Sequence, residues 1–198
     1  MRDGRVAGVL LAAGSSSRLG TNKLLVDFGG ETIVRRAARR ALEAGLAPVI
    51  VVLGFEAERV AEALQGVEVM RVVNPKHAGG MAGSMRAGIG RVPADCEAAV
   101  MILADMPLVT SAMSAGLVAR FRSGPEPLVI SLYGGVQAPP TLYARALFPA
   151  LGAAGEGGGR LVVRDHRGEA AALEWPPALL ADLDRPEDVR RLRSLGPE

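Results

Sequence analysis

Short, fully apolar runs alternate with stretches of helical periodicity along most of this sequence. The apolar runs predict buried strands at residues 6–12, 48–53, 67–73, 98–104 and 127–133. Helices are predicted at residues 32–44, 56–65, 111–121 and 160–163, with a terminal helix whose first turn holds residues 187 and 188. Strands that alternate with helices in this way are typical of an α/β fold. We therefore expect a three-layer α/β/α, doubly wound and mostly parallel sheet.

The predicted helix at residues 32–44 has an apolar face and an opposite face that is strongly basic. The basic residues are Arg35, Arg36, Arg39 and Arg40. Such a run can mark a nucleic-acid surface, but Glu31 and Glu43 can pair with these cations at a spacing of four residues. We therefore expect a solvated face rather than a binding surface.

Length and composition narrow the class of protein. The 198 residues suit a single domain at residues 1–198, because no linker or repeat divides them. The 23 basic residues against 21 acidic ones leave a formal charge of +2, which argues against nucleic acid as a partner. No apolar run approaches the roughly 18 residues that a membrane helix needs. Since no signal-peptide pattern is present either, we expect a cytoplasmic protein that does not bind membranes.

Cys96 is the single cysteine, so no internal disulfide can form, and a reducing compartment fits this composition. It lies between Asp95 and Glu97, and neighbouring carboxylates raise the pKa of a thiol. We predict that this cysteine is inert rather than nucleophilic.

A loop rich in glycine and serine follows the first predicted strand and carries Arg18 and Lys23. Small residues let the backbone approach a ligand, and the two cations offset the charge of a polyphosphate. The loop is not a Walker A motif, because five residues separate Gly14 from Gly20. The dinucleotide fingerprint is also absent. The sequence therefore predicts a phosphate-binding loop of another kind, with an ordinary surface loop as the alternative.

A second polar position follows the apolar run at residues 98–104, in the tripeptide Asp105-Met106-Pro107. Ligands of open α/β sheets bind at the carboxyl ends of strands. A carboxylate buried there is costly unless it binds a cation or a strong donor. Mg²⁺ usually takes one or two carboxylates together with substrate phosphates. Asp105 is therefore a candidate Mg²⁺ ligand, and the alternative is a helix N-cap.

The sequence L-A-A-G-S-S-S-R-L-G-T-N-K-L-L at residues 11–25 resembles the signature L-A-A-G-x-S-x-R-M-G-x-x-K-L-L of the molybdenum cofactor nucleotidyltransferases. It is most similar to the cytidylyltransferase branch, since the guanylyl branch usually has L-A-G-G, and it departs only at Leu19. The resemblance implies a Rossmann-like, glycosyltransferase-A-type nucleotidyltransferase fold. It implies catalytic roles for Arg18, Lys23 and Asp105. The nucleotide-binding residues implied by this motif are Leu11, Ala12, Ala13, Gly14, Ser15, Arg18 and Lys23.

A further segment, which starts at Asn74, resembles a family segment that follows a strand. The resemblance implies that Asn74, Gly80 and Ser84 also belong to the nucleotide pocket. The residues themselves also support this assignment, because a helix start lined with glycines presents backbone N–H groups to a ligand. A plain loop into a capped helix explains the glycines as well. His77, in the same loop, is expected to be a surface residue.

The resemblance adds metal ligands near the end of the chain. D-M-P at Asp105 matches the metal aspartate of the family, and residues 181–188 resemble its D-I-D-T-P-E-D segment. This implies Asp182 and Asp184 as further metal ligands. Because alternate residues of an extended segment face opposite ways, only one of them is expected to reach the metal, and Asp182 is favoured.

Residues 135–140 resemble the acceptor turn of the family, G-x-x-G-H-P, in part. Gln137 and Pro140 are the implied acceptor-binding residues of this turn. Ala138 replaces a glycine, and Pro139 replaces a histidine or similar polar residue. These two changes remove backbone freedom and a hydrogen-bonding side chain, which bears on the identity of the acceptor.

A later loop resembles the family segment G-D-x-G-A-R. It retains Arg160, implied to clamp the phosphate of the acceptor. Glu156 stands where aspartate is usual, and Gly159 stands where alanine is usual.

The function implied by the resemblance is transfer of CMP from CTP to the phosphate of molybdenum-loaded molybdopterin, with Mg²⁺ as the cofactor. GTP as the donor, or a sugar or polyol phosphate as the acceptor, are alternatives within the same chemistry. An alternative of another class is a non-catalytic chaperone that binds nucleotide or molybdopterin. A molybdenum hydroxylase or its maturation factor is the candidate protein partner.

Overall fold

The computed structural model describes residues 2–14, 22–155 and 157–181, and this part of the chain forms one seven-stranded sheet with helices around it. The strands are β1 (Arg5–Ala12), β2 (Val49–Leu53), β3 (Met70–Val73), β4 (Cys96–Leu103), β5 (Leu128–Tyr133), β6 (Val136–Ala144) and β7 (Ala170–Trp175). The α-helices are α1 (Ile33–Glu43), α2 (Ala57–Ala63), α3 (Met81–Ile89), α4 (Ser111–Ser123), α5 (Phe148–Ala153) and α6 (Gly159–Asp165). Short 3₁₀ helices lie at Lys23–Leu25, His77–Gly79, Arg145–Leu147, Arg167–Glu169 and Pro177–Leu179.

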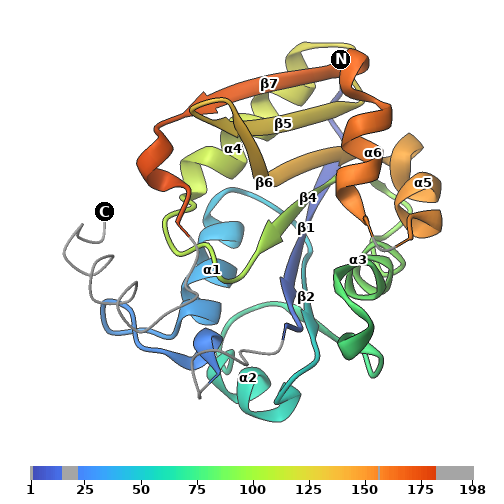
Figure 1. Cartoon of the computed structure of the whole chain (residues 1–198). Coiled ribbons are helices and arrows are strands. Elements are labelled where there is room, and N and C mark those ends of the chain that lie inside the picture. The colour runs from blue at the N-terminus through green and yellow to red at the C-terminus, as the bar shows by residue number, and fades with distance from the viewer. Residues whose placement is uncertain (1, 15–21, 156, 182–198) are drawn as a thin grey trace.

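The strand order is β3-β2-β1-β4-β6-β5-β7 (Figure 1). β1 pairs in parallel with β2 and β4, and β2 pairs in parallel with β3. β6 is antiparallel to both β4 and β5, whereas β5 and β7 are parallel. The prediction of a doubly wound, mostly parallel α/β sheet is confirmed.

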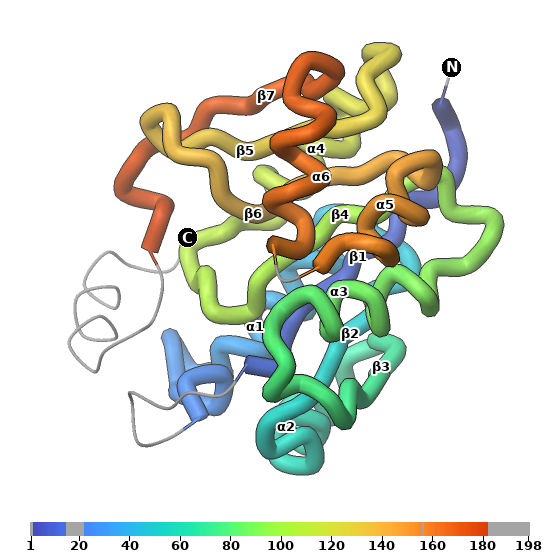
Figure 2. The backbone as a smooth tube through the Cα atoms, turned by 45° about the vertical axis from the view of Figure 1, so that its right-hand side comes forward, coloured from blue at the N-terminus to red at the C-terminus, as the bar shows by residue number. Residues whose placement is uncertain are grey.

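Helices cover both faces of the sheet and give three layers (Figures 1 and 2). α1, α2 and α4 pack on one face, in a core cluster that includes Val34 and Leu117. α3, α5 and α6 pack on the other face, in a second cluster that includes Met85 and Val162. Because both faces are covered, β1 and β2 are apolar at nearly every position. None of the helices among the described residues is both long and apolar enough to cross a membrane.

The hydrophobic pattern did not predict β6, β7 or α5. The turn expected at residues 135–140 is confined to Gly134-Gly135, whose φ angles of 57° and 84° suit a two-residue hairpin. β6 then passes through Pro139 and Pro140, although prolines are rare inside sheets. They are tolerated here because β6 pairs with β4 only from Thr141 onward and its pairing with β5 is irregular at this point.

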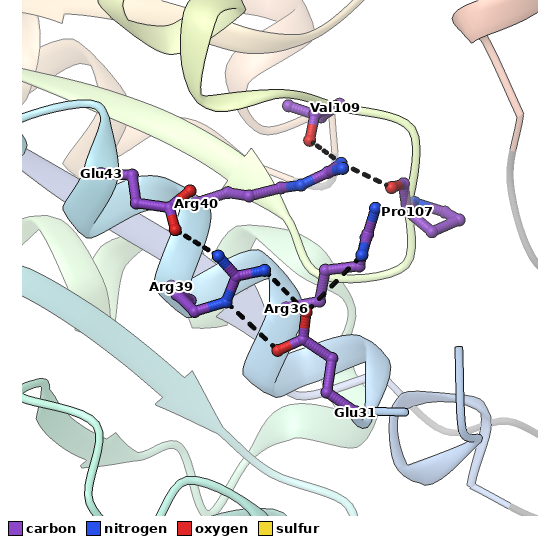
Figure 3. A network of polar contacts seen from close by, with 7 residues as sticks. All are labelled: Glu31, Arg36, Arg39, Arg40, Glu43, Pro107 and Val109. Atoms are coloured by element: carbon purple, nitrogen blue, oxygen red, sulfur yellow. Dashed lines mark hydrogen bonds and ion pairs between the residues drawn. The ribbon is translucent and has the colours of Figure 1, made fainter. Parts of the chain in front are cut away.

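The basic face of α1 is not fully solvated, which corrects the expectation for this helix. Arg39 is exposed and pairs with Glu31 and Glu43, as a surface residue would. Arg36 and Arg40, however, are only 5% and 9% exposed. Arg40 is covered because α1 packs beside α4 and beside the loop that follows β4, whereas Arg36 lies beside Glu31 (Figure 3).

Gly88 lies on the face of α3 that packs against β1 and β2. A Cβ atom there would overlap Val9 and would lie 2.9 Å from Val52 Cγ2. We expect Gly88→Ala to lower the free energy of unfolding by about 1–3 kcal/mol, because the helix must move away from the sheet. Urea denaturation measures this change. Gly152→Ala in α5 is the matched control, since nothing lies within 4 Å of the added methyl group; equal stability of the two variants would contradict the packing argument.

Candidate active site

The segments predicted to bind ligand meet at one edge of the sheet, where parallel strands end together. Leu11 of β1 is opposite Leu103 of β4 in the strand register. The residues that follow the strands are joined as well. Ala104 N donates to the carbonyl of Leu11 at 3.1 Å, and Asn74 N donates to the carbonyl of Leu53 at 2.8 Å.

Lys23 and Asp105, both predicted to be catalytic, form an ion pair at this edge. Lys23 Nζ lies 2.6 Å from Asp105 Oδ2, and the two side chains are only 15% and 25% exposed. Lys23 begins a 3₁₀ helix whose cap is the buried Asn22, and Asn22 Oδ1 accepts a hydrogen bond from Leu24 N at 3.1 Å. The lysine is therefore placed by a fixed turn, and its ammonium group lies against the predicted metal ligand.

A cavity of about 280 Å³ opens beside this ion pair. Its lining includes Asp105 and most of the predicted nucleotide-binding residues, namely Leu11, Ala13, Gly14, Lys23, Gly80 and Ser84. The volume is slightly below the range for small-molecule sites, which begins at about 300 Å³. Most of the residues selected from two separate sequence motifs thus surround one space.

Two of the predicted nucleotide-binding residues lie behind the cavity wall. Ala12 is buried in the core cluster on the α1 side of the sheet. Asn74 is also buried, and its Nδ2 donates to Ser84 Oγ at 3.0 Å. Asn74 Oδ1 accepts a hydrogen bond from Lys76 N at 3.0 Å. Asn74 therefore holds the loop after β3 in shape and orients the hydroxyl of Ser84 in the cavity wall.

Sequence reasoning missed two features of the same wall. His77, expected to be a surface residue, is half-buried and lines the cavity. Gly54 follows β2 directly, and a Cβ atom there would lie 2.6 Å from His77 Cβ and 2.8 Å from Ala13 Cβ. The wall can close only because this position has no side chain. A glycine immediately after an apolar strand was the signal that could have revealed it.

A second cavity, of about 330 Å³, adjoins the first and shares Leu11, Met81 and Leu103 with it. Gln137 and Arg160, two of the predicted acceptor residues, line this second cavity. Its lining also includes four methionines, which are Met81, Met85, Met101 and Met106. Two ligands can therefore lie next to each other across a shared wall.

Pro140, the third predicted acceptor residue, is buried, and its carbonyl accepts a hydrogen bond from Ser131 Oγ at 2.7 Å. Its neighbour Pro139 lines the second cavity instead. The carbonyl of Pro139 accepts a hydrogen bond from the Tyr133 hydroxyl at 2.7 Å. Hydrogen bonds from β5 thus hold both prolines, and of the two only Pro139 lines the second cavity.

Tyr143 of β6 contacts the start of helix α6, whose second residue is Arg160. Its hydroxyl donates to the carbonyl of Gly159 at 3.4 Å. Burial raises the pKa of this hydroxyl, so it stays protonated at neutral pH. A Cβ atom on Gly159 would lie 2.7 Å from the hydroxyl oxygen. The glycine at this position, where the resembling family usually has alanine, therefore accommodates the tyrosine.

We expect Gly159→Ala to cost about 1–2 kcal/mol of unfolding free energy, because the new methyl group overlaps the Tyr143 hydroxyl. Adding Tyr143→Phe should recover part of this loss, because residues in contact are not additive. Urea denaturation of the two single variants and the double variant measures the coupling. Gly155→Ala, with nothing within 4 Å of the new methyl group, is the control. Strict additivity of the two changes would contradict the contact.

Ser15, Arg18, Asp182 and Asp184 lie outside the described residues, as does Glu156. Their assigned roles stay predictions.

Asp105 is the described residue that fits the predicted Mg²⁺. Within the described residues, no group of three or more His, Cys, Asp or Glu side chains could hold a metal ion. A single carboxylate that lines a cavity and already contacts an ammonium group fits an ion completed by substrate oxygens. The chemistry of this position therefore agrees with the metal that the sequence predicts.

Cys96 begins β4 and lies at the opposite end of that strand from Asp105. It is fully buried, and burial, followed by the charge of Asp95, raises the pKa of its thiol. Both features favour the inert cysteine that the sequence predicts.

Several curated proteins resemble this chain. Purine catabolism protein PucB of Bacillus subtilis is 29% identical over an alignment of 213 positions, which covers 98% of each chain. Probable molybdenum cofactor guanylyltransferase of Opitutus terrae is 31% identical over 135 residues, covering 62% of this chain and 64% of that protein. Bifunctional protein GlmU of Rhodococcus opacus is 28% identical over 177 residues, covering 85% of this chain. The match spans only 32% of the length of GlmU.

Similarity to a solved structure and to a family model extends over most of the chain. The crystal structure of Rv0371c from Mycobacterium tuberculosis matches with a TM-score of 0.86 and 27% identity, covering 98% of this chain and 100% of that one. A structure of Rv0371c in complex with manganese matches with a TM-score of 0.79 and 25% identity, covering 96% and 98%. The model of the MobA-like NTP transferase domain matches residues 8–171. With this match across most of its length, the chain belongs to the family of MobA-like NTP transferase domains.

Proposed function

We propose that this protein transfers the CMP group of CTP to the phosphate of a molybdopterin-type acceptor, with Mg²⁺ as its cofactor. The observation that carries the proposal is the Lys23–Asp105 pair at the edge of one cavity that adjoins a second. Transfer between two substrates requires neighbouring sites that hold the reacting atoms together. The relative named as a molybdenum cofactor guanylyltransferase supports the acceptor class, and the Rv0371c complex with manganese supports a divalent metal.

In the proposed reaction, an oxygen of the acceptor phosphate attacks the α-phosphorus of CTP. A new P–O bond forms, and the bond from the α-phosphorus to the oxygen that bridges to the β-phosphate breaks. Pyrophosphate leaves with the electron pair of that bond. The attacking phosphate is already an anion, so no side chain has to remove a proton. Catalysis then comes from positioning and from charge.

The charged residues of the candidate site have distinct proposed roles. Mg²⁺, when bound, neutralises charge on the triphosphate and on the leaving pyrophosphate, and Asp105 would hold it together with Asp182 or Asp184. Lys23 would contact phosphate oxygens once it leaves Asp105, and Arg18 is proposed to do the same. Arg160, at the second cavity, would bind the phosphate of the acceptor.

The first cavity favours CTP over GTP as the proposed donor. The methyl group of Ala13 is part of its wall, held close by the absence of a side chain at Gly54. A wall this close leaves less room for a base, which favours the smaller pyrimidine. GTP remains the alternative donor.

The second cavity favours a flat heterocycle over a polyol as the proposed acceptor. Methionine side chains form much of its lining, and Gln137, Thr141 and Arg160 are among its few polar groups. A sugar or polyol phosphate would place several hydroxyl groups against apolar side chains, where they would lack hydrogen-bond partners. A molybdenum hydroxylase, or its maturation factor, would then receive the product.

Pyrophosphate release tests the proposal. It is measured with Mg²⁺ and either CTP or GTP, in the presence of molybdenum-loaded molybdopterin, of a sugar or polyol phosphate, or of no acceptor. Release that requires both CTP and the pterin would support the proposal. Release with GTP but not with CTP would identify GTP as the donor. Release with CTP and a sugar or polyol phosphate would identify a different acceptor. Saturable CTP binding without release with any acceptor would contradict catalysis and favour the non-catalytic chaperone.

A further inference from the structure

Arg40 links helix α1 to the turn that contains Asp105. Its Nη1 donates to the carbonyl of Pro107 at 2.9 Å and to the carbonyl of Val109 at 2.8 Å. Figure 3 shows the side chain extending from α1 to these two carbonyls. The acceptors are two and four residues beyond Asp105, in a segment outside regular helix and strand. One nitrogen therefore holds two backbone carbonyls on the C-terminal side of the predicted metal ligand.

The burial of this guanidinium group calls for a reason beyond packing. Arg40 is 9% exposed, and burial, aided by the charges of Arg36 and Arg39, lowers its pKa to about 10. The guanidinium group therefore stays charged at neutral pH although it is shielded from water. An apolar side chain would fill the same space without that cost, but it would offer no donor to the two carbonyls. The cation is used here to hold backbone oxygens.

The other side of the turn is held by contacts of a different kind. Ala104 N donates to the carbonyl of Leu11 at 3.1 Å, which joins the start of the turn to β1. Met106 is buried in a small cluster with Val109 and Met113. Asp105 is thus preceded by a residue bonded to β1 and followed by two carbonyls bonded to α1. Its carboxylate can keep one position relative to Lys23 and the first cavity because both flanks are fixed.

The other arginines of the cluster in Figure 3 do not make this contact. Arg39 is exposed and pairs with Glu31 at 2.8 Å and with Glu43. Arg36 is buried, and its Nη1 lies 3.6 Å from Glu31 Oε1. Arg39 therefore offers a matched control on the same helix, because its loss removes a similar charge and leaves the turn untouched.

We infer that Arg40 is a positioning residue for Asp105, and that it sets the affinity of the site for the divalent metal by fixing the turn at residues 105–109. This inference rests on the proposed function, since it concerns the same metal carboxylate. A single nitrogen makes both bonds, so a lysine ammonium at this position could replace part of the contact. A methionine would fill the space without a donor.

The experiment compares Arg40→Met, Arg40→Lys and the control Arg39→Met with the wild-type protein. Hydrogen exchange of the backbone amides at residues 104–110 reports on the turn without metal or substrate. Binding of Mn²⁺, followed by electron paramagnetic resonance in the presence of CTP without acceptor, reports on the site. We expect Arg40→Met to exchange faster in this segment and to bind Mn²⁺ about tenfold more weakly, as is typical when a ligand loses its supporting hydrogen bonds. Arg40→Lys should lie between Arg40→Met and the wild type.

The outcomes separate this inference from the proposed function. A general loss of folding would reduce the amount of binding protein without changing the dissociation constant for Mn²⁺, and Arg40→Lys provides a folded comparison. Wild-type exchange and wild-type Mn²⁺ affinity in a folded Arg40→Met or Arg40→Lys variant would overturn the role of Arg40. Equal effects of Arg39→Met would overturn it too. If the wild-type protein binds no Mn²⁺ with CTP, the proposed metal site is wrong, and the role of Arg40 in metal affinity is wrong with it.

Discussion

Asp105→Asn is expected to lower turnover about 1,000-fold while the protein stays folded. The amide keeps the size of the side chain and removes the negative charge that would hold Mg²⁺. Loss of a group that stabilises charge in the transition state typically costs about 100- to 1,000-fold, and a metal contributes several kcal/mol. Folding should survive because Asp105 lies at the cavity edge, with its side chain 25% exposed, and is absent from the core clusters.

The measurement is steady-state pyrophosphate release at saturating CTP and acceptor, across a range of Mg²⁺ concentrations. Circular dichroism and thermal unfolding confirm that the variant is folded. Asp95→Asn is the control, because this aspartate is exposed and pairs with Arg5 at the opposite end of β4. Turnover close to the wild-type rate in Asp105→Asn would show that the metal is held elsewhere, and the assignment of this carboxylate would fail.

The position of Asp105 could be predicted from the sequence because its signals are local. A carboxylate follows an apolar strand, with a proline two positions later, and parallel strands always bring their carboxyl ends to one edge. The loop after the first strand pointed to Lys23 in a similar way, whereas Gly80 and Ser84 were implied by the resemblance to a known family, and these residues do line one cavity. Local pattern and strand order were therefore sufficient for Asp105 and Lys23 but not for the glycine and serine of the opposite wall.

The acceptor side could not be predicted in the same way because it depends on contacts between distant segments. β6 carries two prolines and so lacks the usual strand pattern, and it exists because β4 and β5 flank it. Tyr143 meets Gly159 only after that strand has formed. The burial of Arg40 has the same origin. Its acceptors belong to a loop nearly 70 residues away in sequence, so periodicity could only suggest a solvated face.

Lys23→Met is expected to have two effects of opposite sign, which makes it the sharpest test of the ion pair. Turnover should fall about 100-fold, because a cation that would stabilise the transferring phosphate is lost. The affinity of the nucleotide-free protein for Mn²⁺ should rise, because the ammonium group no longer competes for Asp105. The competition follows from the distance of 2.6 Å between Lys23 Nζ and Asp105 Oδ2, in a place where both side chains are mostly shielded from water.

Direct Mn²⁺ titration without nucleotide separates the two effects from a loss of structure, since an unfolded variant could not bind the metal more tightly. Lys76→Met is the matched control, because Lys76 is the other lysine of the chain and lies exposed on the loop after β3. Unchanged Mn²⁺ affinity in Lys23→Met would show that lysine and metal do not share the carboxylate. A rise in affinity together with the loss of turnover would mean that the Lys23 ammonium group occupies the metal position on Asp105 until a metal ion arrives with its nucleotide. The ammonium group would then transfer from Asp105 to the phosphate as the metal takes its place.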